Sequence, residues 1–420
     1  MSGYFNKRKI INDPVYGFLT IPFELVFDII EHPWFQRLRR IRQLGLTDLV
    51  YPGALHTRFH HTLGAVHLTG QAIEELRAKD YEISNEEAEA VTLAILMHDI
   101  GHGPFSHALE NSIVTGISHE QISLLFMERL NEEFDGKLDL AIRVFKDEYP
   151  KRFLHQLVSS QLDMDRLDYL RRDSFFTGVS EGVVGSDRII KMLHVVNDEL
   201  AIAHKGIYSI EKFIEARRIM YWQVYLHKAV LSAENLLTQI LRRAKEVAKR
   251  GDELFATPSL KRFLAADFTI EDFRNDATVL SDFSKLDDFD VLTCIKVWAE
   301  EAEPVLAELS RYLVNRQLLK VVFLDQPKSE AEINALQKEL SKMKGFTKEE
   351  ASYFIFQDKI TNNAYDPTKD HINIVYRDGS VKDLVDAADT LNISSLSKTV
   401  EKHFLCVPAE MRHRLNEADS

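Results

Sequence analysis

The sequence predicts a mainly α-helical protein with a small α+β lobe at its C-terminal end. Apolar residues recur at helical spacing through most of the first 250 residues. Runs that alternate or concentrate β-forming residues become frequent only beyond about residue 316, as in KVVFLD, YFIFQD and HINIVYRDG. We therefore expect a helical core at 1–250, a helical extension at 251–315 and an α+β lobe at 316–420.

The composition is that of a folded globular protein with two or three domains. The chain has 420 residues, of which 45% are hydrophobic and 28% are charged. Cys294 and Cys406 lie far apart, which favours a reducing compartment and argues against a thiolate metal site. No signal-peptide core opens the chain and no apolar stretch is long enough to span a bilayer, so we expect a soluble cytoplasmic protein.

The net charge of the chain excludes some classes of binding partner. A net charge of -13 should repel nucleic acid and anionic membranes, so neither is an expected partner. The first 62 residues are an exception, because eight Lys and Arg residues there face five Asp and Glu residues. Any phosphate-binding site must therefore depend on a local basic cluster.

Helices account for most of the expected core. Apolar spacing predicts helices over 23–41, 85–98 and 119–131. Ser118 and Gln121 fit a capping box, which places His119 in the first turn of the third helix. The run from 210 to 250 contains neither Pro nor Gly and predicts one very long helix that ends at Gly251.

The segments outside these helices give weaker signals. LAIAHKGIYS at 200–209 predicts a small hairpin, and the Asp-rich stretch at 267–290 predicts loops. Residues 291–315 are expected to be helical again. The RDG run at 377–379 indicates a turn between two strands of the C-terminal lobe.

The residues best suited to bind a metal or to catalyse a reaction cluster where one apolar helix is expected to end. His98 and Asp99 close the run EAEAVTLAILMHD, and an imidazole nitrogen beside a carboxylate oxygen suits Zn, Mn or Fe. Two ligands hold a metal poorly, so the others must come from elsewhere. The candidates are His60 and His61, which follow Arg58, and the aspartates at 163, 165 and 168.

A structural reading of the same residues competes with this one. A lone His on a helix is most often a satisfied polar residue, and an Asp-rich helix is usually a solvated face. The segment HDIGHGPFSH fits that reading poorly, because three His and one Asp among apolar neighbours would leave several polar groups to satisfy without a ligand.

Taken together, HDIGHGPFSH, the upstream RFHH and the downstream DMDRLDYLRRD resemble the HD-domain phosphohydrolases. Within them the likeness is strongest for the deoxynucleoside triphosphate (dNTP) triphosphohydrolases, in the branch that includes enzymes with a sterile-alpha-motif domain. It extends over roughly 7–250 through NDPVYG, WFQRLRRIRQLG, YPGALHTRFHHT, SHEQIS and YLHK. Beyond about 316 it is much weaker.

The resemblance implies a helical HD core and a set of site residues. The metal ligands would be His61, His98, Asp99 and Asp165, holding one Fe, Mn or Zn ion, with Mg accompanying the bound triphosphate. The catalytic group beside the metal would be His102, Glu110 and His119. The triphosphate would meet Arg58, His107, Arg166, Tyr169 and Arg217, and the deoxyribose would meet Gln43, Leu44, Tyr169 and Asp173. Three residues differ from those of the branch: this chain has Glu110 where the branch has Asp, Arg166 where it has Lys, and Tyr221 where it has His.

The resemblance also implies regulation by nucleotides. Relatives of this branch form active oligomers on binding nucleotides at subunit contacts, so a homo-oligomeric dimer or tetramer with a nucleotide effector is expected. The matching residues are Lys9, Asn12, Asp13, Gln36 and Arg39, with Glu31 in place of the Asp that reads guanine. An ordinary basic surface helix is the competing interpretation.

The first functional hypothesis is a metal-dependent triphosphohydrolase that splits a dNTP into a deoxynucleoside and tripolyphosphate. The alternatives are an HD phosphohydrolase of another nucleotide or phosphate ester, and a nucleotide-sensing assembly protein with little turnover. Arginines together with Tyr169 and Asp173 favour a triphosphate and a sugar, while His102 and His119 favour turnover. A cyclic-dinucleotide phosphodiesterase is disfavoured because the Gly-Tyr-Pro signature of that branch is missing.

Overall fold

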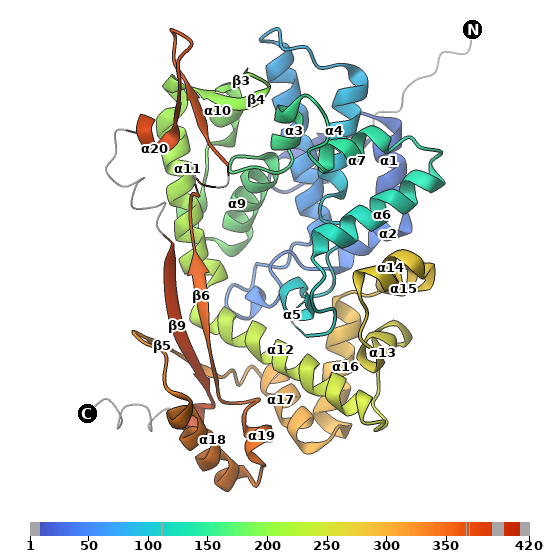
Figure 1. Ribbon diagram of the computed structural model, residues 1–420, viewed down its shortest axis with the longest axis vertical. Helices are drawn as coiled ribbons and strands as arrows, with labels where there is room; N and C mark the ends of the chain where they lie inside the picture. Colours follow the sequence, from blue (N-terminus) through green and yellow to red (C-terminus); the bar gives the residue numbers. More distant parts are fainter. Residues whose placement is uncertain (1–8, 111, 367, 369, 389–398, 412–420) are drawn as a thin grey trace.

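A computed structural model describes residues 9–110, 112–366, 368, 370–388 and 399–411, with the side chain of His107 left out. Helices dominate the described chain, and strands gather mainly in its C-terminal third (Figure 1). The expected fold class, a helical core with a smaller α+β region, is confirmed. Among the described residues no helix has the length and apolar character needed to cross a membrane.

A short hairpin and two small helices open the described chain. Strands β1 (Ile10–Asp13) and β2 (Gly17–Thr20) pair antiparallel, and α1 (Glu24–Glu31) and α2 (Pro33–Gln36) follow. The single helix expected over 23–41 is therefore wrong. His32 has an extended backbone with ψ of 137°, as a residue before proline prefers, and this conformation ends α1.

Four helices form the centre of the core. These are α3 (Arg58–Arg77), α4 (Asn85–Met97), α6 (His119–Glu133) and α9 (Met164–Thr177). The helices expected over 85–98 and 119–131 are confirmed, and Ser118 and Gln121 form the expected capping box. Shorter helices join or flank them: α5 (Ser106–Glu110), α7 (Asp139–Phe145), α8 (Arg152–Gln156) and α10 (Ser186–Lys191).

The helices α3 and α9 approach each other closely because a glycine lies between them. A Cβ on Gly64 would collide with the Asp168 carboxylate and with Arg172 of α9. Any larger residue at 64 would therefore push the two helices apart. This close approach brings side chains of α3 and α9 to one buried centre.

The long helix expected over 210–250 is wrong. The chain forms α11 (Ile207–Met220), a π-helical turn (Tyr221–Tyr225) and then α12 (Lys228–Lys249). His227 is extended, with ψ of 135°, and its ring nitrogen accepts the backbone N–H of Ala229. A histidine thus caps α12 without the Gly or Pro that would have indicated a break. The expected end near Gly251 is confirmed.

The hairpin and the loops expected in two other segments also need correction. The hairpin is formed by β3 (Leu193–Val196) and β4 (Glu199–Ala203), because Asn197 and Asp198 both adopt the positive φ of a tight hairpin turn. The segment 267–290 is largely helical, and two of its aspartates act as helix caps. Asp276 caps α15 and Asp287 caps α16 with their side chains.

The helical extension packs beside α12 (Figure 1). It contains α13 (Pro258–Ala265), α14 (Ile270–Asn275), α15 (Ala277–Phe283), α16 (Asp288–Glu301) and α17 (Pro304–Val314). The last two confirm the helical expectation for 291–315.

The C-terminal region supplies strands to two sheets. The order β5-β9-β6 makes one antiparallel sheet, and β3-β4-β7-β8 makes the other, with β4 parallel to β7. The second sheet thus joins the C-terminal region to the helical core, and the turn expected at 377–379 links β7 to β8. Division into three domains stays a prediction. The bounds are β5 (Lys320–Leu324), α18 (Glu330–Lys344), α19 (Lys348–Ala351), β6 (Phe356–Asn362), β7 (Asn373–Val375), β8 (Val381–Asp383), α20 (Leu384–Ala387) and β9 (Val400–Val407).

Candidate metal centre

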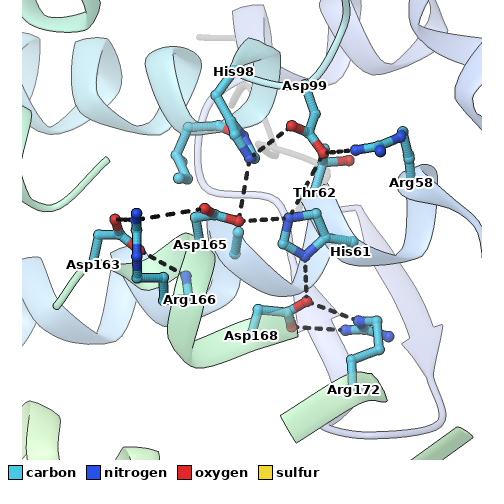
Figure 2. A network of polar contacts seen from close by, with 12 residues as sticks. Arg58, His61, Thr62, His98, Asp99, Asp163, Asp165, Arg166, Asp168 and Arg172 are labelled. Carbon is cyan, nitrogen blue, oxygen red and sulfur yellow. Dashed lines mark hydrogen bonds and ion pairs between the residues drawn. The ribbon is translucent and has the colours of Figure 1, made fainter. Parts of the chain in front are cut away.

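Two histidines and two aspartates from three helical segments meet at the centre of the core. His61 lies on α3, His98 and Asp99 lie where α4 ends, and Asp165 lies in the first turn of α9. Figure 2 shows these side chains pointing toward one another. The structure therefore brings together all four residues that the sequence predicts as metal ligands.

The spacing of the donor atoms suits one ion. His61 Nε2 lies 3.0 Å from Asp165 Oδ1 and 3.9 Å from Asp99 Oδ2. His98 Nε2 lies 3.3 Å from Asp99 Oδ1 and 3.5 Å from Asp165 Oδ1. Ligands held about 2.0–2.2 Å from a common divalent ion have separations of about this size.

Unsatisfied nitrogens support the same reading. The Nε2 atoms of His61 and His98 are buried and make no well-directed hydrogen bond to the described residues, and their near neighbours are the carboxylate oxygens of the other two ligands. Buried polar atoms without partners are costly, and a metal ion would satisfy both. Two neutral imidazoles and two carboxylates also balance the charge of a divalent ion. The residues present therefore fit a divalent transition metal, although they do not select one.

A second layer of contacts orients His61. Its Nδ1 lies 2.8 Å from Asp168 Oδ2, and Arg172 donates to both oxygens of Asp168 at 2.9 and 3.0 Å. Burial lowers the pKa of His61, but its contacts with Asp165 and Asp168 outweigh that effect and raise it to about 10. Asp168 holds the ring so that Nε2 faces the centre.

The predicted catalytic residues lie next to the metal ligands. His102 Nε2 is 3.2 Å from Asp99 Oδ1, and the rings of His102 and His119 stack with centroids 3.7 Å apart. His119 Nδ1 lies 3.1 Å from Glu110 Oε1. A Cβ on Gly101 would collide with the backbone of α6, so glycine at 101 lets His119 approach the HD segment.

A cavity of about 370 Å³ opens beside this centre. Arg58 lines it, donates to Asp99 Oδ2 at 2.5 Å and to Ser106 Oγ at 3.2 Å, and keeps a buried Nε without a partner. Gln43, Leu44, Tyr169 and Asp173 line the same cavity. Asp173 already accepts the Tyr225 hydroxyl at 2.7 Å and contacts His56 Nε2 at 2.8 Å. A sugar hydroxyl would therefore have to share this carboxylate.

Two of the predicted triphosphate contacts are not among the residues that line this cavity. Arg166 pairs with Asp163 of its own helix start. Arg217 donates to Gln161 Oε1 at 3.3 Å and to the Ala364 carbonyl at 3.1 Å. The predicted contact of His107 lies outside the described side chains. Of the predicted triphosphate residues, Arg58 and Tyr169 border the open space.

The predicted effector residues lie near the N-terminal hairpin and α1. Lys9 Nζ sits 3.3 Å from the Phe27 ring centroid, and Arg39 donates to Gln36 at 2.7 Å. Glu31 is exposed at the end of α1, close in sequence to these residues. Asp13 differs from the others because it is buried and pairs with Arg172 at 2.7 Å. It thus supports the second layer around His61.

Sequence reasoning missed several residues of the site. Arg172 was not singled out, although the Asp-x-x-x-Arg spacing from Asp168 fits a pair on one helical face. Tyr225 and Glu234 line the cavity from the segment expected to be one continuous helix. No local motif marks Glu234, and only its apolar neighbours on α12 hint that it faces the interior of the protein.

Known proteins match this chain over both its core and its full length. The HD domain model matches residues 58–172, and the model of the HD associated region matches 184–257. The uncharacterized protein YwfO of Bacillus subtilis is 32% identical over 91% of this chain and 88% of its own length. A crystal structure of a phosphohydrolase from Bacteroides thetaiotaomicron has a TM-score of 0.92 and 56% identity over 96% of this chain and all of its own.

Two further relatives are deoxynucleoside triphosphate triphosphohydrolases by name. The deoxynucleoside triphosphate triphosphohydrolase SAMHD1 homolog of Dictyostelium discoideum is 31% identical over 59% of this chain and 52% of its length. The deoxynucleoside triphosphate triphosphohydrolase SAMHD1 of Homo sapiens is 29% identical over 58% of this chain and 46% of its length. The matched region thus spans about half of each of these two proteins.

Proposed function

Because the chain belongs to the HD-domain phosphohydrolase family, we propose that it is a metal-dependent dNTP triphosphohydrolase. The reaction would split a dNTP into a deoxynucleoside and tripolyphosphate by attack of water at the α-phosphorus. The observation that carries the proposal is the convergence of the His/Asp centre, the stacked pair His102 and His119, and Arg58 on one cavity. The similarity to two deoxynucleoside triphosphate triphosphohydrolases supports a dNTP as the substrate.

The chain's own residues supply most of the machinery. A divalent ion held by His61, His98, Asp99 and Asp165 would contribute Lewis-acid chemistry at a phosphoryl oxygen. The guanidinium of Arg58 borders the cavity and can hold phosphate oxygens through its fork of donors. His119 can hold a proton for the leaving oxygen, while Glu110 orients its ring through Nδ1.

A second candidate has a specific observation in its favour. Arg166 and Arg217 have protein partners and are not among the residues that line the cavity. A smaller anionic group would need fewer cations than a triphosphate. This observation favours a different nucleotide or phosphate ester as substrate, with the same metal and the same histidines.

Product analysis separates these candidates. The metal-loaded protein would be incubated with each of the four dNTPs, with AMP and with an aryl phosphate, and its products resolved by anion-exchange chromatography. We expect deoxynucleoside and tripolyphosphate from dNTPs, and little release from the monoesters. Orthophosphate from AMP or the aryl phosphate with no dNTP turnover would favour the second candidate. Nucleotide binding without any product would favour the remaining hypothesis, a nucleotide-sensing assembly protein with little turnover.

We also propose that nucleotides control assembly of a homo-oligomer. Lys9 lies over the Phe27 ring of α1, Arg39 follows α2, and Glu31 is exposed at the end of α1. An effector shifts an assembly equilibrium only through its higher affinity for the assembled state. Light scattering and turnover of one dNTP should therefore rise together when GTP, dGTP or dATP is added. An unchanged mass and rate with every addition would leave this face as plain surface.

A further inference from the structure

Glu234 is a partly buried carboxyl group of the cavity that the proposed reaction does not use. It lies on α12, one helical turn after Val230, and both residues line the cavity that also contains Asp99 and Tyr169. The metal ligands, the histidines and Arg58 account for the chemistry at phosphorus. Glu234 therefore needs another explanation.

The contacts of Glu234 leave half of its carboxyl group available. Oε1 accepts the backbone N–H of Leu46 at 2.8 Å, and Gly45 passes so close that a Cβ there would collide with this oxygen. Oε2 has no hydrogen bond to any described residue, and no described Lys, Arg or His forms an ion pair with Glu234. The loop 43–47 thus fixes one oxygen, and the other is free to meet a ligand in the cavity.

The charged groups around Glu234 differ from those at the metal site. Arg58 and the metal ligands Asp99 and Asp165 line the cavity, and Glu234 lines it too, while the lining residue Arg42 is already paired with Asp48 at 2.7 Å. Burial, followed by the negative charges of Asp288 and Asp48, raises the pKa of Glu234 to about 7. A carboxylate without a cationic partner repels a triphosphate, whereas it does not repel an uncharged nucleobase with N–H donors. The base would therefore occupy the space beside Glu234 while the phosphates face Arg58.

We propose that Glu234 is a specificity-determining residue that selects nucleobases presenting an amino group to the inner wall of the cavity. The inference rests on the proposed dNTP activity. The free carboxylate oxygen accepts the N–H of an exocyclic amino group. A carbonyl oxygen at the same position would face this oxygen without a donor between them, which is unfavourable in a buried site. The cleanest comparison is dCTP with dUTP, because their six-membered rings differ at this amino or carbonyl edge.

The test compares Glu234→Gln with the wild type at pH 8, where the carboxyl group is mostly ionised. Glutamine keeps the size of the side chain, and the Leu46 N–H will hold its amide oxygen toward the loop. Its NH2 group then faces the cavity and favours a carbonyl. We expect wild type to prefer dCTP in kcat/KM, and the dCTP to dUTP ratio to fall about tenfold or more in the variant. Glu246→Gln is the matched control, because Glu246 lies on the same helix and pairs with Arg243 and Arg250 outside this cavity.

A second variant guards against a loss of folding. Glu234→Asp keeps the charge but withdraws it by one methylene, and it should also lower the ratio, with melting temperature and metal content measured for both variants. An unchanged ratio in a folded, active Glu234→Gln, or in Glu234→Asp if the first variant does not fold, would overturn the inference. Equal use of dCTP and dUTP by wild type would overturn it too, while leaving the dNTP activity in place. If wild type splits no dNTP at all, the proposed function itself fails.

Discussion

Replacing His98 and Asp99 together with alanine is expected to abolish both metal content and hydrolysis. The double variant removes two of four ligand groups, and the remaining pair, His61 and Asp165, cannot enclose an ion. A bound metal contributes several kcal/mol of stabilisation to a phosphoryl transition state. Its loss should therefore reduce the rate by about 10³-fold or more. Elemental analysis of the purified protein and the product assay measure the two effects separately.

The metal-free protein should remain folded at neutral pH, and this makes the test interpretable. Without an ion, the raised pKa of His61 keeps its ring protonated, and the positive charge sits between Asp165 and Asp168. A metal must displace that proton, so loading should weaken as the pH falls. Titrating the metal into wild-type protein at several pH values would show this dependence.

A matched control separates metal loss from a general loss of histidine. His67 lies on α3 with His61, but its ring contacts Tyr16 and Gln71 and lies outside the metal cluster. His67→Ala should keep both the metal and the activity. Full metal occupancy in the His98→Ala, Asp99→Ala double variant would show that the ion is held elsewhere, and the ligand assignment would then be wrong.

The parts of the fold that the sequence predicted are those with strong local signals. The capping box at Ser118 and the apolar helix that ends at His98 are both where they were expected. The break before α12 was not predicted, because a π-helical turn and a histidine cap replace the usual Gly or Pro. Its consequence is functional, since Tyr221 and Tyr225 of that turn line the cavity.

The residues of the site also differ in whether the local sequence reveals their role. His98 and Asp99 are adjacent in the chain, so their motif is visible without a structure. Arg166 and Arg217 were expected at the phosphates, yet Asp163 and the Ala364 carbonyl engage them. Asp163 caps α9, and residue 364 lies almost 150 positions after Arg217. The Asp163–Arg166 pair has a local i,i+3 spacing that was not weighed against the phosphate role, whereas the Ala364 carbonyl comes from a distant segment that leaves no pattern near Arg217.

The second large loss of activity is expected when His119 is replaced by alanine. The acid that protonates the leaving oxygen must reach the cavity and carry a proton near neutral pH. His102 is unsuited to this role, because burial and the nearby Arg58 hold its pKa well below the usual range. A divalent ion beside Asp99 would lower it further. His119 is less buried, lines the same cavity and has its Nδ1 beside the Glu110 carboxylate.

His119→Ala should therefore retain its metal and lose about 10²–10⁴ in rate, the usual contribution of a positioned general acid. Metal retention is expected because His119 is not among the four ligands, and elemental analysis checks it in the same preparation. Glu110→Gln should have a smaller effect, since it leaves the imidazole in place and removes only the charge that orients it. His102→Ala serves as the comparison, because both histidines share the stacked pair. If His119→Ala stays within threefold of wild type while His102→Ala is severely impaired, the acid is His102, and the charge environment of the stacked pair must change when substrate binds.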